Sequence, residues 1–517
     1  MALKEYHPEQ QLLLWAPPQD VLPPDHLCFI VDEIVEQLDL TALPDRRKTP
    51  GHPAYDARVL VKILFYGYAT GTFSSRKLMK ACQEGLPYTF LTREQFPDFR
   101  TISDFRKDNR KVIEDLFVQI VRLAYDMGVA NLGTVALDST KIRANASRRA
   151  TFRTEEFERE IAQFLQQGVG VDEDEDNRFG KEKTGEEQPE QLRTSKQRLQ
   201  RLKQVLKRVA EQERNFVNVT DPESGFQAKG KALIPSYNAQ AVVDKNGVVV
   251  DACVRSNPAD YDGLPQAVEN IQNNLSATPS RLLSDSGFHS KKNLKLLEEE
   301  QIEGYIPSQQ QARDSKDKYQ PSKFSKDKFS YDAENKCYVC PAGEKLTLWR
   351  TSNSARQYLF RGGSCPQCRY LTQCVRGQTP HRIISRSFDE QIMDRMRQRM
   401  ESEQGKEIYS QRKWMIEPLF GHFKHNLKFR QFLTRGKRSV ETEWLLLCIA
   451  NNIRKVGHLL LKPPLRPAVA QANVGEIPLV RANDCLTQAL SSALTSLRTA
   501  FMGKTGSFRH KFTFCVH

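Results

Sequence analysis

The fold of this chain is decided by the stretch Gly133-Thr-Val-Ala-Leu-Asp138-Ser-Thr-Lys-Ile-Arg143. Its β-branched residues and its alternation of apolar and polar side chains predict a β-strand. We expect Asp138 at or near the end of that strand, where a carboxylate projects from a sheet.

More strands and helices follow in alternation. Residues 236–243 and 248–254 form two alternating runs separated by Asn246-Gly247, which is a strong hairpin signal. A helix is expected over 259–275, and a short strand then ends at Asp285. A further helix from residue 293 and a strand over 304–307 complete a pattern that indicates a mixed α/β sheet.

Residues 1–125 are expected to be mostly helical. Val59, Leu60, Ile63, Leu64 and Tyr68 have the spacing of an amphipathic helix. Further helices are expected to begin near residues 74 and 100, and they carry basic edges. Such edges suit recognition of DNA, but a helical bundle with solvated lysines is an equally good interpretation.

The composition limits the classes of function that this protein can have. The chain of 517 residues is long enough for two to four domains. Its 77 lysines and arginines exceed its 63 acids, and the net charge of +14 favours a polyanionic partner, above all nucleic acid. No apolar run approaches the about 18–20 residues of a membrane span, and the N-terminus lacks a signal-peptide core. We therefore expect a cytoplasmic protein that does not enter membranes.

A second informative stretch is Arg412-Lys-Trp-Met-Ile-Glu417-Pro-Leu-Phe-Gly-His-Phe-Lys424. It sets one acid among basic and aromatic residues. Glu417 is expected just ahead of a helix, as its N-cap, with Pro418 as the first helical residue. Intervals of 7 and 11 residues would then put Lys424 and Lys428 on the same face as Glu417. Trp414 is expected to pack rather than to stack on bases.

Three acids suit phosphodiester chemistry. Two Mg²⁺ ions about 3.5–4 Å apart can activate a nucleophile and stabilise a leaving oxygen, and carboxylates must hold them. Asp138, Asp285 and Glu417 are the candidates. Taken singly, each could equally be a solvated acid at the end of an element.

Together, four motifs resemble the DDE transposases of bacterial insertion sequences. These are Asp138-Ser-Thr-Lys-Ile-Arg-Ala-Asn, Tyr237-Asn-Ala-Gln, Asp285-Ser-Gly-Phe-His-Ser and Ile416-Glu-Pro-Leu-Phe-Gly. Within that group the chain most resembles the branch with a Cys-rich insertion ahead of the third acid. The resemblance covers about residues 50–460.

The resemblance implies an RNase H-like core preceded by a helical domain. Asp138 would lie on the first strand, Asp285 after the fourth, and Glu417 on a late helix. Asp138 would bridge two Mg²⁺ or Mn²⁺ ions, and the other two acids would each complete one metal shell.

The third-acid motif of the wider group also implies DNA-binding residues. Its tyrosine and lysine match Tyr409 and Lys424. Four residues instead of three separate Arg412 from Glu417, so either Arg412 or Lys413 could meet the terminal phosphate. The full candidate set for DNA contact is Tyr409, Arg412, Lys413, Lys424, Lys428 and Arg430.

Five cysteines cluster ahead of this motif. Cys337 and Cys340 form one C-x2-C pair, Cys365 and Cys368 form another, and Cys374 follows. Four of these thiolates would suit a structural Zn²⁺ in a zinc-ribbon-like insertion. The ion could stabilise the fold, or the insertion could act as a DNA clamp that holds the duplex. The family resemblance would leave Cys337 as the spare.

The expected organisation combines these parts. The segments are a helical DNA-binding domain (1–125), the first part of the core (126–150), a charged helical insertion with an acidic loop at 171–191 (151–220), the second part of the core (221–310), the Cys-rich insertion (311–385), the C-terminal core helices (386–463) and a tail (464–517).

The resemblance implies a transposase that binds the inverted-repeat ends of its element, cleaves them and joins the 3′ ends to target DNA. Such a reaction implies a homodimer in the synaptic complex. Two alternatives stay open: a non-catalytic, zinc-containing DNA-binding protein, such as a regulator or a decayed transposase, and an RNase H-like nuclease without strand transfer.

Overall fold

The structure is a computed structural model. It describes residues 17–43, 54–156, 159, 216–229, 232–257, 259–314, 323–375 and 379–460. The expected acidic loop at 171–191 and the tail from residue 464 lie outside the described residues.

The described part of the N-terminal segment is helical, as predicted. Asp56 begins one of its main helices by accepting a hydrogen bond from the backbone N–H of Arg58, and Gly71 ends that helix with a φ of +83°. The helices are α1 (Pro18–Val21), α2 (Leu27–Gln37), α3 (Ala57–Thr70), α4 (Ser75–Glu84), α5 (Leu86–Thr92), α6 (Phe99–Asp108) and α7 (Arg110–Asp126).

The main sheet has six strands and is mixed, as predicted. Its strand order is β4-β5-β1-β7-β8, and β6 also pairs with β5. The central strand β1 is antiparallel to β5 and parallel to β7. The strands are β1 (Thr134–Arg143), β4 (Gly225–Lys229), β5 (Ala232–Asp244), β6 (Val249–Arg255), β7 (Arg281–Ser284) and β8 (Glu303–Tyr305).

The hairpin predicted around Asn246-Gly247 is present. It joins β5 to β6, and Gly247 has a φ of +79°, a conformation that favours glycine. Separately from the main sheet, the short strands β2 (Thr151–Arg153) and β3 (Phe216–Asn218) pair with each other.

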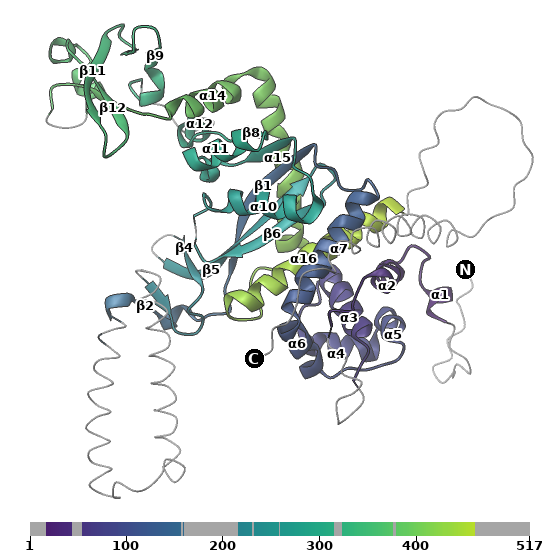
Figure 1. The fold of residues 1–517 in the computed structure, drawn as a ribbon. Helices are drawn as coiled ribbons and strands as arrows, with labels where there is room; N and C mark the ends of the chain where they lie inside the picture. The colour runs from purple at the N-terminus through teal and green to yellow at the C-terminus, as the bar shows by residue number, and fades with distance from the viewer. Residues whose placement is uncertain are drawn as a thin grey trace, which may run out of the picture.

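A long helix, α16 (Lys437–Leu460), joins the main sheet to the N-terminal helices. Trp444 on α16 is fully buried, and its Nε1 donates a hydrogen bond to the backbone carbonyl of Gln240 on β5 at 2.9 Å. Figure 1 shows α16 running between the sheet and helices α3 and α7. One continuous hydrophobic core therefore spans the N-terminal helices, α16 and the sheet. We call this unit the main core.

A buried ion pair reinforces that junction. Arg106 on α6 and Glu443 on α16 are almost fully buried, and Arg106 Nη1 lies 3.5 Å from Glu443 Oε1. Arg106 also donates to the hydroxyl of Tyr68 at 3.0 Å. The backbone N–H of Leu433 donates to Glu443 Oε2 at 2.9 Å. Two otherwise costly buried charges are thus paired and hydrogen-bonded.

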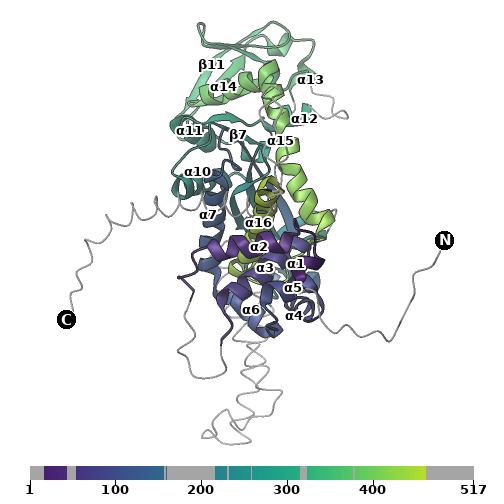
Figure 2. The same ribbon diagram turned by 90° about the vertical axis from the view of Figure 1, so that its right-hand side faces the viewer.

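The Cys-rich segment forms a second sheet with its own small core. We call it the Cys-rich sheet; all its strands are antiparallel, in the order β13-β12-β11-β10-β9. Figures 1 and 2 place it at the opposite end of the molecule from the N-terminal helices. Its strands are β9 (Ser330–Asp332), β10 (Cys337–Val339), β11 (Lys345–Ser352), β12 (Gln357–Gly362) and β13 (Ile383–Ser387).

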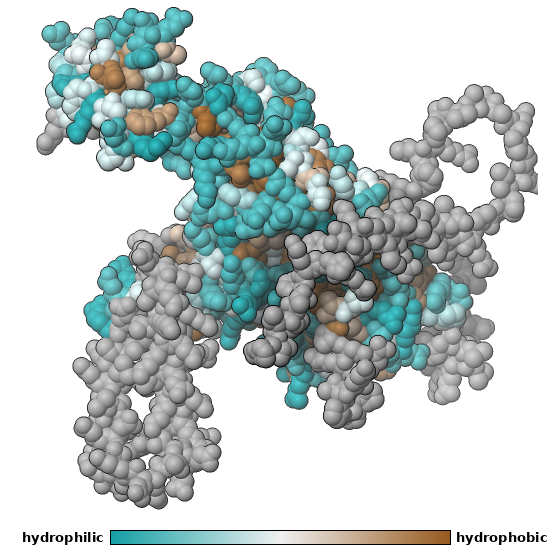
Figure 3. Space-filling model, in the orientation of Figure 1, coloured by the Kyte–Doolittle hydropathy of each residue, from teal (hydrophilic) through white to brown (hydrophobic). Residues whose placement is uncertain are grey.

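The remaining helices surround the main sheet and connect the Cys-rich sheet to it. They are α10 (Gly263–Leu275), α11 (Lys291–Glu299), α12 (Gln309–Asp314), α14 (Glu390–Glu401) and α15 (Glu403–Gly421). The short helix α13 (Leu371–Cys374) lies within the Cys-rich segment. The face seen in Figure 3 is mainly hydrophilic with small apolar patches. Among the described helices, none has the length and apolar character needed to cross a membrane.

Candidate active site

The sheet brings Asp138 and Asp285 together. Leu137 on β1 pairs with Ser284 on β7, so Asp138 and Asp285 follow neighbouring residues on adjacent parallel strands. Ser284 Oγ donates to the carbonyl of Leu137 at 2.9 Å and fixes this register. The expectation that Asp138 ends its strand was wrong, because β1 continues to Arg143 as the partner of β5. It is β7 that ends here.

Both aspartates are in a poorly hydrated environment. Burial, and to a lesser degree the charge of Asp285, raise the pKa of Asp138 to about 6, against the lowering effect of Arg412. Burial also raises the pKa of Asp285, while a hydrogen bond from the backbone N–H of Gly287 to its Oδ1 at 2.9 Å lowers it. The nearby acid Asp260 contributes a further rise. Two adjacent, partly buried carboxylates favour a bound cation.

Arg412 already supplies positive charge to this pair. It extends from α15, and its Nη1 donates to Asp138 Oδ2 at 2.6 Å, with both side chains only about 15% exposed. The ring of Tyr409 lies beside it, with its centroid 5.9 Å from the guanidinium carbon. A metal ion that binds Asp138 must share or displace the Arg412 contact.

Glu417 lies inside α15, which begins after the cap residue Ser402. The prediction that Glu417 caps a helix beginning at Pro418 was wrong, because the helix passes through both residues. Glu417 is exposed and, among the described residues, forms no hydrogen bond or ion pair. Its carboxylate is therefore available to an incoming ligand.

The exposed face of α15 also carries Lys413 and Trp414, which precede Glu417 by four and three residues. Trp414 is 54% exposed, so the expectation that it packs was wrong. The physical reason is that α15 turns a different face, with Ile416 and Leu419, toward the core.

Two side chains tie this part of the helix to β1. Arg412 contacts Asp138, and Lys424 Nζ contacts the hydroxyl of Thr140, two residues farther along the same strand face. Glu417 lies between these two attachment points in the chain. Burial lowers the pKa of Lys424.

The basic side chains that were expected to share one helix face with Glu417, which we call the basic track, change direction after Lys424. A π-helical turn, His422–Asn426, follows α15. Lys428 then has a φ of +60°, so the prediction that it shares the helix face of Glu417 was wrong. Lys428 and Arg430 are exposed, and Arg430 Nε donates to the carbonyl of Lys424 at 3.1 Å.

The acids fit a hard divalent cation in donor chemistry, although they do not form a closed site. A side-chain carbon placed on Gly287 would lie 3.0 Å from both Asp285 Oδ1 and Asp260 Oδ2. The glycine thus keeps a small space open between oxygen ligands of the kind that Mg²⁺ prefers. Across the described ranges, no three His, Cys, Asp or Glu side chains are yet arranged to hold a metal ion.

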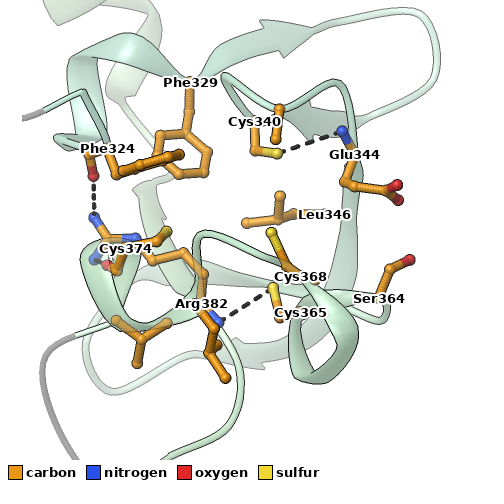
Figure 4. A pocket seen from close by; sticks show the side chains of 14 residues that line it. Phe324, Phe329, Cys340, Glu344, Leu346, Ser364, Cys365, Cys368, Cys374 and Arg382 are labelled. Carbon is orange, nitrogen blue, oxygen red and sulfur yellow. Dashed lines mark hydrogen bonds between the residues drawn. The ribbon is translucent and has the colours of Figure 1, made fainter.

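Four of the five clustered cysteines line one small cavity of about 30 Å³. Figure 4 shows the sulfur atoms of Cys340, Cys365, Cys368 and Cys374 around a common space. Burial raises the pKa of the Cys374 thiol, Arg382 opposes that rise, and the other three thiols add to it. Backbone N–H groups of Glu344 and Arg382 donate to the sulfurs of Cys340 and Cys365.

Cys337 does not line that cavity. It lies on β10 and is only 3% exposed. The cavity is large enough for an ion but too small for an organic ligand.

Sequence reasoning missed Asp260 and Thr140. Asp260 lies in the turn between β6 and α10, and Asn238 Nδ2 donates to its Oδ1 at 2.6 Å. Thr140 lies within the Asp138 motif but was given no role, and no motif marks Asp260, because both gain their neighbours only when the sheet forms. A signal could have come only from the predicted pairing of β1 with β5.

Comparison with known families gives two matches. A family model described as "Transposase DDE domain" matches residues 339–457, which include Glu417 and the four cavity cysteines. A second, described as "Transposase domain (DUF772)", matches residues 17–108 in the N-terminal helices. Neither match includes Asp138 or Asp285. No curated protein matches the chain.

Proposed function

We propose that this chain, a DDE transposase of an insertion sequence family by its two family-model matches, binds the inverted-repeat ends of its element, cleaves them and joins the 3′ ends to target DNA. The observation that carries the proposal is the neighbouring placement of Asp138 and Asp285, with Arg412 and Lys424 attaching the helix of Glu417 to the same strand.

Asp138, Asp285 and Glu417 would hold two Mg²⁺ or Mn²⁺ ions. When bound, such ions activate the attacking oxygen and stabilise the leaving oxygen of an in-line displacement at phosphorus. The contribution of the protein is to position Asp138 in mid-β1 next to Asp285 at the end of β7, and to keep both poorly hydrated. Glu417, on the exposed face of α15, would complete the set when DNA and metal arrive.

We assign the phosphate contact at the transposon end to Lys413 rather than Arg412. Arg412 is bound to Asp138 and half-buried, whereas Lys413 is exposed beside Trp414 and Glu417. Lys424, Lys428 and Arg430 would continue the basic track along the DNA backbone, with Tyr409 orienting Arg412.

The Cys-rich sheet would hold a structural Zn²⁺ through Cys340, Cys365, Cys368 and Cys374, with Cys337 as the spare. Four thiols around one cavity support this ligand set. A closed tetrahedral site has no position for a substrate, so the ion would stabilise the fold only.

The same sheet is a candidate DNA clamp. Residues 323–387 contain twelve lysines and arginines against four acids. Trp349 is 49% exposed, and the guanidinium carbon of Arg361 lies 5.6 Å from its ring centroid. Phosphate neutralisation with an aromatic contact would suit a DNA backbone.

The test uses the full-length protein with a duplex that carries the element's end. Wild type should cut and join this duplex when Mg²⁺ is present, and Asp138→Asn should bind it without cutting. Asp262→Asn, which changes an exposed acid at the start of α10, is the matched control and should cut normally. Cutting without joining would indicate a nuclease, and binding without cutting by wild type would indicate a DNA-binding protein.

The proposed joining reaction also requires two ends to be held at once. We propose a homodimer in the complex with DNA ends. The mass of the protein–DNA complex, measured by light scattering with one end duplex per chain, should correspond to two chains and two duplexes. A complex of one chain and one duplex would contradict the homodimer.

A further inference from the structure

A fourth acid lies beside the proposed metal-binding aspartates. Asp260 precedes α10 and lies close to both Gly287 and Asp285. Both carboxylates direct one oxygen toward the position that a side chain at residue 287 would occupy, each at 3.0 Å. Two like-charged groups this close favour either a raised pKa or a shared cation.

The position of Asp260 is fixed by a buried amide. Asn238 on β5 is only 2% exposed, and its Nδ2 donates to Asp260 Oδ1 at 2.6 Å. This bond occupies one oxygen of Asp260 and leaves Oδ2 beside Gly287. Asn238 Oδ1 is itself buried without a hydrogen-bond partner in the described structure. A buried, unpaired acceptor on the amide that holds Asp260 indicates a missing positive or donor group, such as a hydrated cation.

A purely structural role explains Asp260 less well. Its carboxylate does not cap α10, because Asp262 occupies the cap position and Asp260 contributes only its backbone carbonyl to the N–H of Gly263. In the described part of the chain, no lysine or arginine forms an ion pair with Asp260. Lys141 and Arg412 are the cations that influence neighbouring Asp285.

We propose that Asp260 is a fourth metal-binding acid, which shares with Asp285 the divalent cation held at that position. This inference rests on the proposed function, because the ion in question is the one used for DNA cleavage. Asn238 is then a positioning residue that orients Asp260, and Gly287 keeps the space for the ion open. Asp260 would reach the ion directly or through one of the waters that Mg²⁺ retains.

The experiment measures Mn²⁺ binding to the full-length protein by calorimetry, without DNA. Asp260→Asn should weaken the binding of one ion by about tenfold or more, which corresponds to about 1.4 kcal/mol. Asp262→Asn should bind Mn²⁺ as wild type does. Unchanged Mn²⁺ affinity in Asp260→Asn, with the Asp285→Asn comparator weakened, would overturn the proposal.

A second variant covers the case in which Asp260→Asn fails to fold. Gly287→Ala retains both acids but puts a methyl group between them, at 3.0 Å from each oxygen. It should weaken Mn²⁺ binding in the same way, and wild-type affinity in this variant would also overturn the proposal.

The metal-binding role of Asp260 and the proposed function can be disproved separately. If wild type binds Mn²⁺ through Asp260 but cuts no end duplex, the proposed function fails and the metal site stands. If wild type cuts and joins DNA while Asp260→Asn binds Mn²⁺ normally, the metal-binding role of Asp260 fails alone.

Discussion

The main core and the Cys-rich sheet are stabilised by different means. The main core joins the N-terminal helices, α16 and six strands through one continuous set of buried apolar side chains. The Cys-rich sheet has only six buried apolar residues in its own cluster: Phe324, Phe329, Tyr338, Leu346, Phe360 and Ile384. A core that small rarely stabilises a fold alone, whereas the main core needs no such support.

The two regions also use different ligand chemistry. The carboxylates beside the end of β7 are partly buried oxygen ligands, which suit a hard cation that exchanges ligands during reaction. Thiols in the Cys-rich sheet converge on a small cavity and suit a soft, permanently held cation. Under the proposed function, the carboxylates would hold ions used for chemistry and the thiols an ion used for folding.

The largest expected effect is the loss of zinc, which should unfold the Cys-rich sheet and leave the main core folded. Cys368→Ser should lose one bound zinc per chain, and the Cys-rich sheet should become sensitive to protease while the main core stays folded. Structural zinc binding is worth roughly 10–16 kcal/mol in small domains, which exceeds what this apolar core can supply. Zinc content by mass spectrometry and limited proteolysis provide the measurement.

Cys337→Ala is the matched control for that experiment, because Cys337 is buried on β10 away from the cavity. It should retain its zinc. Equal zinc loss in both variants, or full zinc retention in Cys368→Ser, would contradict the assigned ligand set.

The next effect concerns the main core alone. Glu443→Gln removes the partner of the buried Arg106 charge, and it should lower the free energy of unfolding by about 3–5 kcal/mol. Urea unfolding followed by tryptophan fluorescence measures the loss, because Trp444 is buried beside this pair. The protease resistance of the Cys-rich sheet should not change.

A double variant, Arg106→Met with Glu443→Leu, serves as its control. It removes both charges and should recover most of the lost stability. If Glu443→Gln alone is as stable as wild type, α16 does not join the N-terminal helices to the sheet in the way described.

A smaller effect depends on pH. Burial raises the pKa of Asp251 on β6 to about 7, while the amide of Asn270 donates to its Oδ1 at 3.0 Å. The unfolded chain has the ordinary, lower pKa, so the folded state binds the extra proton between about pH 4 and 7. The stability contributed by this protonation is complete below the unfolded value and is lost as the pH rises through about 7.

Asp251→Asn should therefore flatten the decline in stability between these pH values, by on the order of 3 kcal/mol. Thermal unfolding at a series of pH values measures the slope, with Asp262→Asn as the control at an exposed acid. An unchanged slope in Asp251→Asn would show that this carboxyl is ionised in the folded state.

The smallest effect concerns an exposed ion pair between two helices that pack on the main core, near its connection to the Cys-rich sheet. Arg395 on α14 pairs with Glu298 on α11 at 2.7 Å, and both side chains are about half exposed. Because water screens this pair, Glu298→Gln should change the free energy of unfolding by less than about 1 kcal/mol, as thermal unfolding would show. A loss as large as that of Glu443→Gln would mean that the connection to the Cys-rich sheet carries unexpected stability.

Much of the architecture followed from local sequence patterns. The alternating runs around Asn246-Gly247 predicted the hairpin, and the apolar spacing of residues 59–68 predicted a helix. The mixed sheet followed from the order of strands and helices. The boundaries expected for the helical domain, the two insertions, the core parts and the tail remain predictions.

The errors arose where distant segments decide the local structure. Asp138 lies in mid-strand because β5 extends the pairing of β1 beyond β7. Pro418 lies inside α15 because the surrounding helix is held by buried Ile416 and Leu419. The π-helical turn after Gly421 then moves Lys428 away from the face of Glu417.

The candidate site could be predicted only in part for the same reason. Motifs identified Asp138, Asp285 and Glu417, but the contact between Arg412 and Asp138 joins residues 274 positions apart. The proximity of Asp260 to Asp285 likewise depends on the turn before α10 and on Asn238 of β5.

The central claim is that Glu417, exposed on α15, completes a metal site with Asp138 and Asp285. The most direct measurement is Mg²⁺-dependent cleavage of the end duplex by wild type and by Glu417→Gln. We predict that both proteins bind the duplex equally and that Glu417→Gln cuts it at least roughly a thousandfold more slowly, because several kcal/mol of transition-state stabilisation is lost. Equal cleavage rates would show that Glu417 is not the third acid, and the account of the site would be wrong.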